Sequence, residues 1–194
     1  GIPADHLVFS RNTTEAINLV ARGICWEKGD EVVTTALEHH ANLLPWLALR
    51  ERGARGKVVP QEGGYVQEGG IQEAVGRATR LVAVNHVTNV LGTVIPVEED
   101  AQVAHDAGAA ILVDAAQSIG HMPMPRTDLF DYLAIPGHKG LLGPQGTGAL
   151  YIADPDTLAA SCYGGGMVAD VSHDQFTLLP CPARFEPGAP NIPG

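Results

Sequence analysis

The sequence is poor in basic residues and in cysteine. Lysine and arginine together number 12, against 22 aspartates and glutamates, so the formal net charge at pH 7 is -10. No run of basic residues is long enough to neutralise several adjacent phosphates, and we expect neither nucleic acid nor an acidic membrane as a partner. The three cysteines, Cys25, Cys162 and Cys181, are an odd number without CxxC spacing, which argues against a disulfide framework and a zinc knuckle.

Two further patterns are absent, a long apolar segment and a metal-binding motif. The longest apolar stretches, such as residues 107–113, are far shorter than the roughly 20 residues that cross a bilayer. The N-terminus lacks the basic-then-apolar pattern of a signal peptide, which favours a soluble, cytoplasmic protein. The eight histidines show no HExxH or comparable spacing, so we expect no metal site.

The pattern that is present is an alternation of short apolar runs with segments of helical periodicity, with glycine or proline at most joints. Strands are predicted at residues 7–9, 31–34, 56–59, 81–85, 110–113, 132–135 and 148–152. Helices are predicted at residues 14–23, 41–52, 71–75 and 98–107. Near-continuous apolar strands are typical of a parallel sheet with helices on both faces, so the sequence predicts a single α/β domain. From about residue 154 onward, consecutive glycines and frequent prolines predict an irregular tail.

Polar residues follow five of the predicted strands. They lie at residues 10–14, 38–40, 85–86, 114–117 and 137–140. The carboxyl ends of parallel strands meet at one edge of a sheet, where ligands bind. Each segment alone is also explained by a turn or a helix cap, but five such segments at one edge indicate a ligand site.

Six segments carry a family resemblance, namely residues 11–18, 38–42, 89–93, 114–117, 137–139 and 185–191. In order and rough spacing they are similar to the class V aminotransferase and cysteine desulfurase family, nearest to its SufS-like and selenocysteine-lyase branch. The resemblance implies a pyridoxal-phosphate (PLP) dependent transferase of fold type I. It further implies that residues 1–194 are the PLP-binding large domain, without the family's N-terminal segment and C-terminal small domain.

The cofactor implied by the resemblance needs a lysine amine to which it attaches. Lys139 is the best of the three lysines, because it lies in a glycine-flanked loop after a buried strand, where backbone can approach a ligand closely. Lys28 lies in a turn-like stretch and Lys57 begins a strand. We expect both of those side chains to point to water.

The ring of the cofactor draws on a second set of residues. A carboxylate beside the ring nitrogen would keep it protonated, and Asp114 fits that role, although an Asx turn or helix cap is its alternative. The resemblance implies that Gln117 and Asn89 contact the phenolic oxygen. It also implies that His39 stacks on the ring and shuttles protons, as an imidazole can near neutral pH. His40 is expected to be a neighbour without a catalytic part.

The phosphate of the cofactor needs donors at a helix N-terminus, and Thr13 and Thr14 offer both hydroxyls and free backbone N–H groups. A simple helix cap is compatible with that role. The resemblance adds His138 as a phosphate contact. The sequence departs from the family at Pro136, where relatives offer Ser or Thr, and at Ala189, where a Thr often reaches the partner subunit's phosphate. Two lost hydroxyls, at roughly 1 kcal/mol each or more, would weaken cofactor binding about tenfold or more.

A cysteine desulfurase also needs a cysteine nucleophile and an arginine for the substrate carboxylate, and in the family both lie beyond the matched region. Cys25 is predicted to be a core residue, while Cys162 and Cys181 match no family nucleophile. Arg184 is a candidate for an anion contact. The resemblance also implies a homodimer, with residues 185–194 similar to the segment that crosses the interface, and a sulfur-acceptor protein as a second partner.

Three interpretations remain open. The first is a desulfurase or selenocysteine lyase domain, which takes sulfur from L-cysteine or selenium from selenocysteine and leaves alanine. The second keeps the PLP site but carries out another class V lyase or aminotransferase reaction. The third is a domain that folds and associates without turnover, which Pro136, Ala189 and the missing C-terminal part favour.

Overall fold

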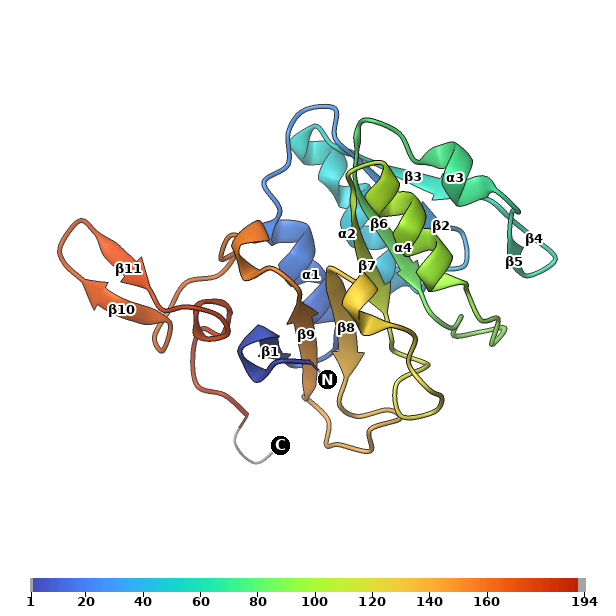
Figure 1. Ribbon diagram of the computed structural model, residues 1–194. Coiled ribbons are helices and arrows are strands. Elements are labelled where there is room, and N and C mark those ends of the chain that lie inside the picture. Colours follow the sequence, from blue (N-terminus) through green and yellow to red (C-terminus); the bar gives the residue numbers. More distant parts are fainter. Residues whose placement is uncertain (1, 192–194) are drawn as a thin grey trace.

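A seven-stranded sheet forms the centre of the fold (Figure 1). The structure is a computed structural model that describes residues 2–191. The strands lie in the order β1-β9-β8-β7-β6-β2-β3. Their bounds are Leu7–Ser10 (β1), Glu31–Thr35 (β2), Arg55–Val59 (β3), Thr79–Asn85 (β6), Ala110–Asp114 (β7), Tyr132–Pro136 (β8) and Gly148–Ile152 (β9). Each of the seven strands predicted from the sequence is therefore present.

The strand directions bring most carboxyl ends to one edge. Strands β3, β2, β6, β7 and β8 pair in parallel, as predicted for most of the sheet. Strand β9 is antiparallel to β8 and also to β1, so β1 runs in the same direction as β8. The loops that follow β1, β2, β6, β7 and β8 consequently leave the sheet at the same edge.

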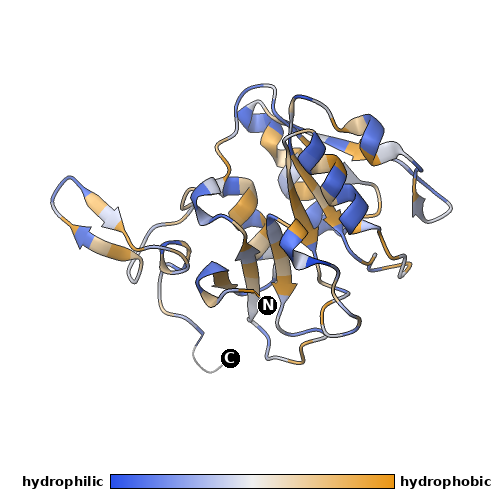
Figure 2. Ribbon diagram, in the orientation of Figure 1, coloured by the Kyte–Doolittle hydropathy of each residue, from blue (hydrophilic) through white to orange (hydrophobic). Residues whose placement is uncertain are grey.

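Helices cover both faces of the sheet, as predicted (Figure 1). Alternate side chains of β6 point to opposite faces, as a strand requires. Leu81 belongs to the core that contains Ile17 of α1, whereas Val82 belongs to the core that contains Ala101 of α4. In Figure 2 the sheet is mostly hydrophobic, whereas the helices also carry hydrophilic residues. The helix bounds are Thr13–Gly23 (α1), Leu44–Ala48 (α2), Gly70–Ala74 (α3) and Val97–Asp106 (α4).

The single helix predicted over residues 41–52 is wrong. The segment consists of two short 3-10 turns, η2 (His40–Asn42) and η3 (Leu49–Arg52), on either side of α2. Pro45 has no backbone N–H, so the helical hydrogen bond from residue 45 to the carbonyl of Ala41 cannot form. The break leaves the chain after His39 free to turn toward the edge of the sheet.

The sequence predicted an irregular tail from about residue 154, but part of that tail forms a regular hairpin. Strands β10 (Val168–Val171) and β11 (Phe176–Leu178) pair as an antiparallel hairpin that projects from the body of the fold (Figure 1). A second small hairpin joins β4 (Gln61–Glu62) and β5 (Tyr65–Val66). The remaining 3-10 turns are η1 (Ala4–His6), η4 (Thr127–Leu129), η5 (Pro155–Thr157) and η6 (Ala183–Phe185).

Two side-chain predictions are also wrong. Cys25 is exposed rather than part of the core, because α1 ends at Gly23 and the chain has left the apolar face of the helix by residue 25. Lys57 does not simply point to water: its Nζ lies 2.7 Å from Oε2 of Glu31 and donates to the carbonyl of Ala74 at 3.1 Å. Within residues 2–191, no helix has the length and apolar character that crossing a membrane would require.

Candidate functional site

A cavity of about 420 Å³ lies at the edge of the sheet where β6, β7 and β8 end. The N-terminus of α1 reaches the same place, because β1 runs parallel to β8. The cavity is within the range of small-molecule sites. All eight residues that the sequence singled out line it: Thr13, Thr14, His39, Asn89, Asp114, Gln117, His138 and Lys139. The structure thus brings the candidates together, while their roles toward a cofactor stay predictions.

Glycines hold the loop that carries Lys139 against its neighbours. Gly143 N–H donates to the carbonyl of Gly137 at 2.7 Å, which closes the loop around the lysine. A Cβ atom on Gly140 would lie 2.1 Å from the carbonyl oxygen of Ile119, and one on Gly120 would lie 2.3 Å from the carbonyl oxygen of Gly140. Only glycine permits so close a backbone approach. The contact joins the Lys139 loop to the segment that carries Gln117.

Asp114 is the last residue of β7 and is only 3% exposed. Its Oδ1 accepts a hydrogen bond from the N–H of Ala116 at 2.8 Å, so the Asx turn that was its alternative role is present within the cavity lining. Burial raises the pKa of Asp114 to about 6, although the Ala116 N–H and the charge of Lys139 oppose that rise. The carboxylate is consequently ionised at neutral pH but destabilised by its surroundings.

His39 precedes the η2 turn, and its Nδ1 accepts a hydrogen bond from the N–H of Ala41 at 3.1 Å. Because Nδ1 accepts, we assign the ring proton of the neutral imidazole to Nε2. Burial lowers the pKa of His39, and the positive charges of Lys139 and His40 lower it further. His39 is therefore neutral near pH 7 and carries its proton on the nitrogen that is not bound to the loop.

Three buried polar atoms of residues that line the cavity lack a partner among residues 2–191, namely Oγ1 of Thr13, Oδ1 of Asn85 and Nδ1 of His138. A buried polar atom left without a hydrogen bond costs roughly 1–3 kcal/mol, which a bound polar group would recover. Thr13 begins α1, whose first backbone N–H groups have no partner within the helix and whose dipole favours an anion. The Thr13 hydroxyl and the His138 ring nitrogen can donate to the phosphate of the predicted cofactor, whereas the amide oxygen of Asn85 can only accept.

Among the further residues that line the cavity without a predicted role are Asn12 and Asn85. Asn12 caps α1 by accepting from the N–H of Glu15 at 2.9 Å. Asn85 ends β6, and its Nδ2 donates to the carbonyl of Leu37 at 2.9 Å. Both stand within the polar segments that follow strands, so the position of each at a strand end was the available signal.

The two departures from the family pattern lie in different places. Pro136 lines the cavity and offers it no hydroxyl, in agreement with the missing donor inferred from the sequence. Ala189 is exposed and is not among the lining residues. No group of three or more metal-ligating side chains is arranged to hold a metal ion in the described part of the chain.

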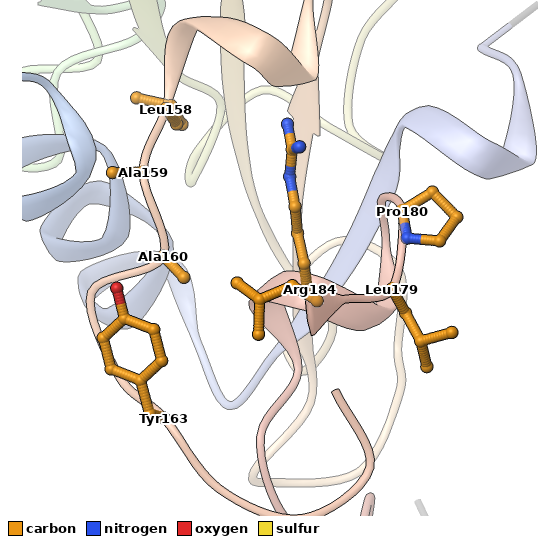
Figure 3. A pocket seen from close by; sticks show the side chains of 8 residues that line it. Leu158, Ala159, Ala160, Tyr163, Leu179, Pro180 and Arg184 are labelled. Carbon is orange, nitrogen blue, oxygen red and sulfur yellow. The ribbon is translucent and has the colours of Figure 1, made fainter. Parts of the chain in front are cut away.

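A second, shallower pocket of about 500 Å³ lies beside the tail (Figure 3). Its lining is mostly apolar and includes Leu158, Leu179 and Pro180. Arg184 also borders it, but its Nη2 donates to the carbonyl of Pro155 and lies 3.0 Å from Oδ1 of Asp156. An acidic side chain of the protein thus already pairs with the guanidinium, and the role of Arg184 as a contact for a ligand anion stays a prediction.

Comparison with known proteins places this site in context. Residues 1–194 match the family described as "Aminotransferase class-V". A "Probable cysteine desulfurase" of Methanothermobacter thermautotrophicus is 53% identical over 98% of this chain and 49% of that protein. The chain spans about half the length of the first curated relatives it matches.

Two solved structures show the same fold. The apo cysteine desulfurase of Thermococcus onnurineus NA1 superimposes with a TM-score of 0.91 at 42% identity, over 97% of this chain and 48% of that one. A C-DES variant with glycine covalently linked to its PLP cofactor superimposes with a TM-score of 0.85 at 26% identity, over 95% and 51% of the two chains.

The raised pKa of Asp114 makes a prediction for the cofactor-free chain. Between its ordinary pKa of 3.8 and about 6, the folded chain holds a proton that the unfolded chain has lost. The contribution of this group to the free energy of unfolding therefore falls as the pH rises, by up to roughly 3 kcal/mol. Asp114→Asn should remove that fall, so the variant should gain stability relative to the wild type from about pH 4 to pH 7, measured by urea denaturation.

Asp128→Asn is the matched control. Arg126 lowers the pKa of the exposed Asp128 carboxyl, so removing that charge should not produce a gain with rising pH. Stability curves of wild type and Asp114→Asn that run parallel over this pH range would contradict the assignment of a buried, titrating Asp114.

Proposed function

Because this chain belongs to the class-V aminotransferase family, we propose that it is the PLP-binding half of a cysteine desulfurase-like enzyme, which removes sulfur from L-cysteine, or selenium from selenocysteine, and releases alanine. The observation that carries the proposal is the convergence of the eight candidate residues on one cavity around Lys139. The relatives named cysteine desulfurase support the choice of reaction within the family.

The chain's own residues fit the parts of the cofactor. Lys139 would hold PLP covalently, Thr13 and His138 would bind its phosphate through their unpartnered buried atoms, and Asp114 would contact the ring nitrogen. When bound, PLP supplies an aldehyde that joins amines and a ring that withdraws electrons from the substrate carbon.

Asp114 and His39 would each act on the bound group through a defined protonation state. Above its pKa of about 6, Asp114 is an anion at the buried end of β7, where it would favour a positive charge on the ring nitrogen. His39 is neutral because its pKa is lowered, and its Nε2–H can donate a hydrogen bond to a bound group while Nδ1 accepts from the N–H of Ala41. Near neutral pH both residues are in the protonation state that these roles need.

The sulfur-accepting nucleophile is proposed to lie outside this chain. None of the three cysteines lines the cavity. Cys25 and Cys162 are exposed, and burial raises the pKa of the half-buried Cys181, which disfavours the reactive thiolate. We assign the nucleophile to the other half of the complete protein, together with the site for a sulfur-acceptor protein, and we place the enzyme in the cytoplasm.

The same lack of a lining cysteine favours a second candidate, a C–S lyase that needs no protein nucleophile. A cystine C–S lyase, C-DES, solved with its product cysteine persulfide, superimposes with a TM-score of 0.86 at 27% identity. This alternative keeps the proposed cofactor and site but changes the products, because elimination gives pyruvate and ammonia rather than alanine.

We also propose that the complete protein is a homodimer. The hairpin of β10 and β11 exposes Val171 and Phe176, and the ring of Tyr163 packs edge-on against Phe176 at 5.7 Å between centroids. A two-stranded hairpin has little stability without further packing. A second copy that covers this apolar side would supply it, together with residues 185–191 of the predicted crossing segment; residues 192–194 of that segment lie outside the described part.

Borohydride trapping tests the cofactor. After incubation with PLP and reduction, mass spectrometry of the digested wild-type chain should find the pyridoxyl group on Lys139, and Lys139→Ala should abolish it. Lys28→Ala is the control, because Lys28 is exposed and remote from the lining, and this variant should keep the label. A folded wild-type chain without label on Lys139 would rule out both PLP reactions.

The products decide between the two reactions. The complete protein that contains this chain should release alanine and sulfide from cysteine in equal amounts in the presence of a thiol reductant. Pyruvate in place of alanine would favour the C–S lyase. A protein that takes up PLP yet forms neither product would support a domain without turnover.

Light scattering tests the dimer. The complete wild-type protein should have twice the mass of one chain, and Phe176→Asp should shift it toward the monomer, because a charge would be buried in the proposed contact. Tyr65→Asp serves as a control on the exposed strand β5 and should leave the mass unchanged. A monomeric wild-type protein would contradict the proposal.

A further inference from the structure

A buried carboxyl group joins the loop of His39 to the sheet. Glu38 is 8% exposed and immediately precedes His39. Its Oε1 accepts from Oγ1 of Thr35 at 2.8 Å and from the N–H of Asn85 at 3.1 Å, and its Oε2 accepts from Nδ2 of Asn42 at 2.7 Å. One side chain therefore connects the end of β2, the η2 turn and the end of β6.

The surrounding hydrogen bonds fix the direction of all three contacts. Oγ1 of Thr35 accepts from the N–H of Leu37, so its own proton is free for Glu38. Oδ1 of Asn42 accepts from Nε1 of Trp46 at 3.1 Å, which turns the NH₂ group of Asn42 toward Glu38. A backbone N–H can only donate. Glu38 is thus held as an acceptor, and these donors oppose the burial and the charge of Asp114 that raise its pKa to about 8.

Asn85, to which Glu38 is bound at the end of β6, is part of the candidate site. Asn85 is the register partner of Asp114 across β6 and β7, and its side chain lines the cavity. The Nδ2 group of Asn85 also donates to the carbonyl of Leu37 at 2.9 Å. The His39 loop is therefore bound to the end of β6 through Glu38 and again through Leu37.

A comparison with Glu31 shows that burial alone does not explain Glu38. Glu31 lies at the other end of β2 and is equally buried, but Arg55 and Lys57 lie 2.6 and 2.7 Å from its carboxylate. No ion pair within residues 2–191 joins Glu38, whose donors are all neutral. The position of the Glu38 side chain therefore depends on hydrogen bonds from the residues around it, and the same bonds hold the His39 loop in place.

We propose that Glu38 is a positioning residue, whose two carboxyl oxygens clamp the His39 loop to the end of β6 and thereby fix His39 relative to Lys139 and Asp114. The catalytic meaning of this position rests on the function proposed above. The clamp itself is a property of the cofactor-free chain and can be measured without PLP.

The test uses two NMR measurements on the cofactor-free chain. The first is the pKa of the His39 ring, assigned with His39→Gln. The second is the exchange rate of the Asn85 amide relative to that of Ala83 in the same strand, so that a general loss of stability cancels. Glu38→Gln should raise the His39 pKa toward its ordinary value, because the loop loses the burial and the nearness to Lys139 that lower it. Glutamine replaces the oxygen that accepts from Asn42 with an NH₂ group, so two donors would face each other and the clamp should open. The relative exchange of Asn85 should then rise about tenfold or more.

Glu31→Gln is the matched control, because it removes an equally buried carboxylate from the same strand. A structural effect alone would change both variants alike, whereas the clamp predicts that Glu31→Gln leaves both measurements unchanged. Equal responses of the two variants, or no response to Glu38→Gln, would overturn the proposal.

A milder pair of variants decides the matter if Glu38→Gln does not fold. Thr35→Val removes one donor to Glu38 and should move both measurements in the same direction, whereas Thr35→Ser keeps the hydroxyl and should restore wild-type values. Unchanged values in a folded Thr35→Val chain would count against the clamp. Because none of these measurements involves PLP, failed trapping on Lys139 would overturn the proposed function and leave the clamp standing.

Discussion

The site depends on the register in which β6, β7 and β8 pair. That register sets Asn85 opposite Asp114 and Asp114 opposite Ala134, so two polar side chains end adjacent strands side by side. A shift of one residue would turn each side chain to the other face of the sheet and carry Asp114 into an apolar core. The continuous apolar strands Leu81–Val84 and Ile111–Val113 oppose such a shift, because both of their faces are already packed.

The same edge concentrates charge in a low-dielectric place. Asp114 and Glu38 are both buried there, and each has a raised pKa, while Lys139 is the cation that opposes the rise at Asp114. One of the three lysines of this acidic protein therefore lies close enough to the buried Asp114 to influence its pKa. The unpartnered atoms of Thr13 and His138 lie on the same cavity. Unsatisfied and shifted groups are tolerated when a ligand uses them, and this gathering is the physical reason to regard the cavity as a site.

Sequence reasoning succeeded where one rule acted alone. The apolar runs predicted the strands, and the rule that ligands gather at carboxyl ends predicted that five polar segments share one edge, where seven of the eight candidates lie. The eighth, Asn89, came from the family resemblance. Sequence reasoning failed where one local interaction overrode the general pattern of the segment. Pro45 interrupted a segment that otherwise had helical periodicity, and Lys57 was drawn to the buried Glu31 rather than to water.

Other features were beyond the reach of sequence pattern. Cys25 lies two residues past the end of a helix, a boundary that periodicity cannot place to that accuracy. The β10 and β11 hairpin lies between glycine-rich and proline-rich stretches, whose composition concealed its short strands. The role of Glu38 depends on three donors, one of which lies 47 residues from it in the sequence, and no local motif records such a set.

The lining of the cavity also shows what the chain does not supply. It contains a lysine, two histidines, a buried carboxylate and several amides and hydroxyls, but no cysteine and no arginine. Arg11 precedes the lining residue Asn12 in the sequence, and Arg184 lies in the tail. Each forms an ion pair with an acidic side chain of the chain itself, Arg11 with Glu15 and Arg184 with Asp156. A reaction on an amino acid needs a cation for the substrate carboxylate, and desulfuration needs a thiol as well. On the function proposed above, the described residues would supply the cofactor site, and the groups that hold the substrate and accept its sulfur would come from another part of the complete protein or from a second copy.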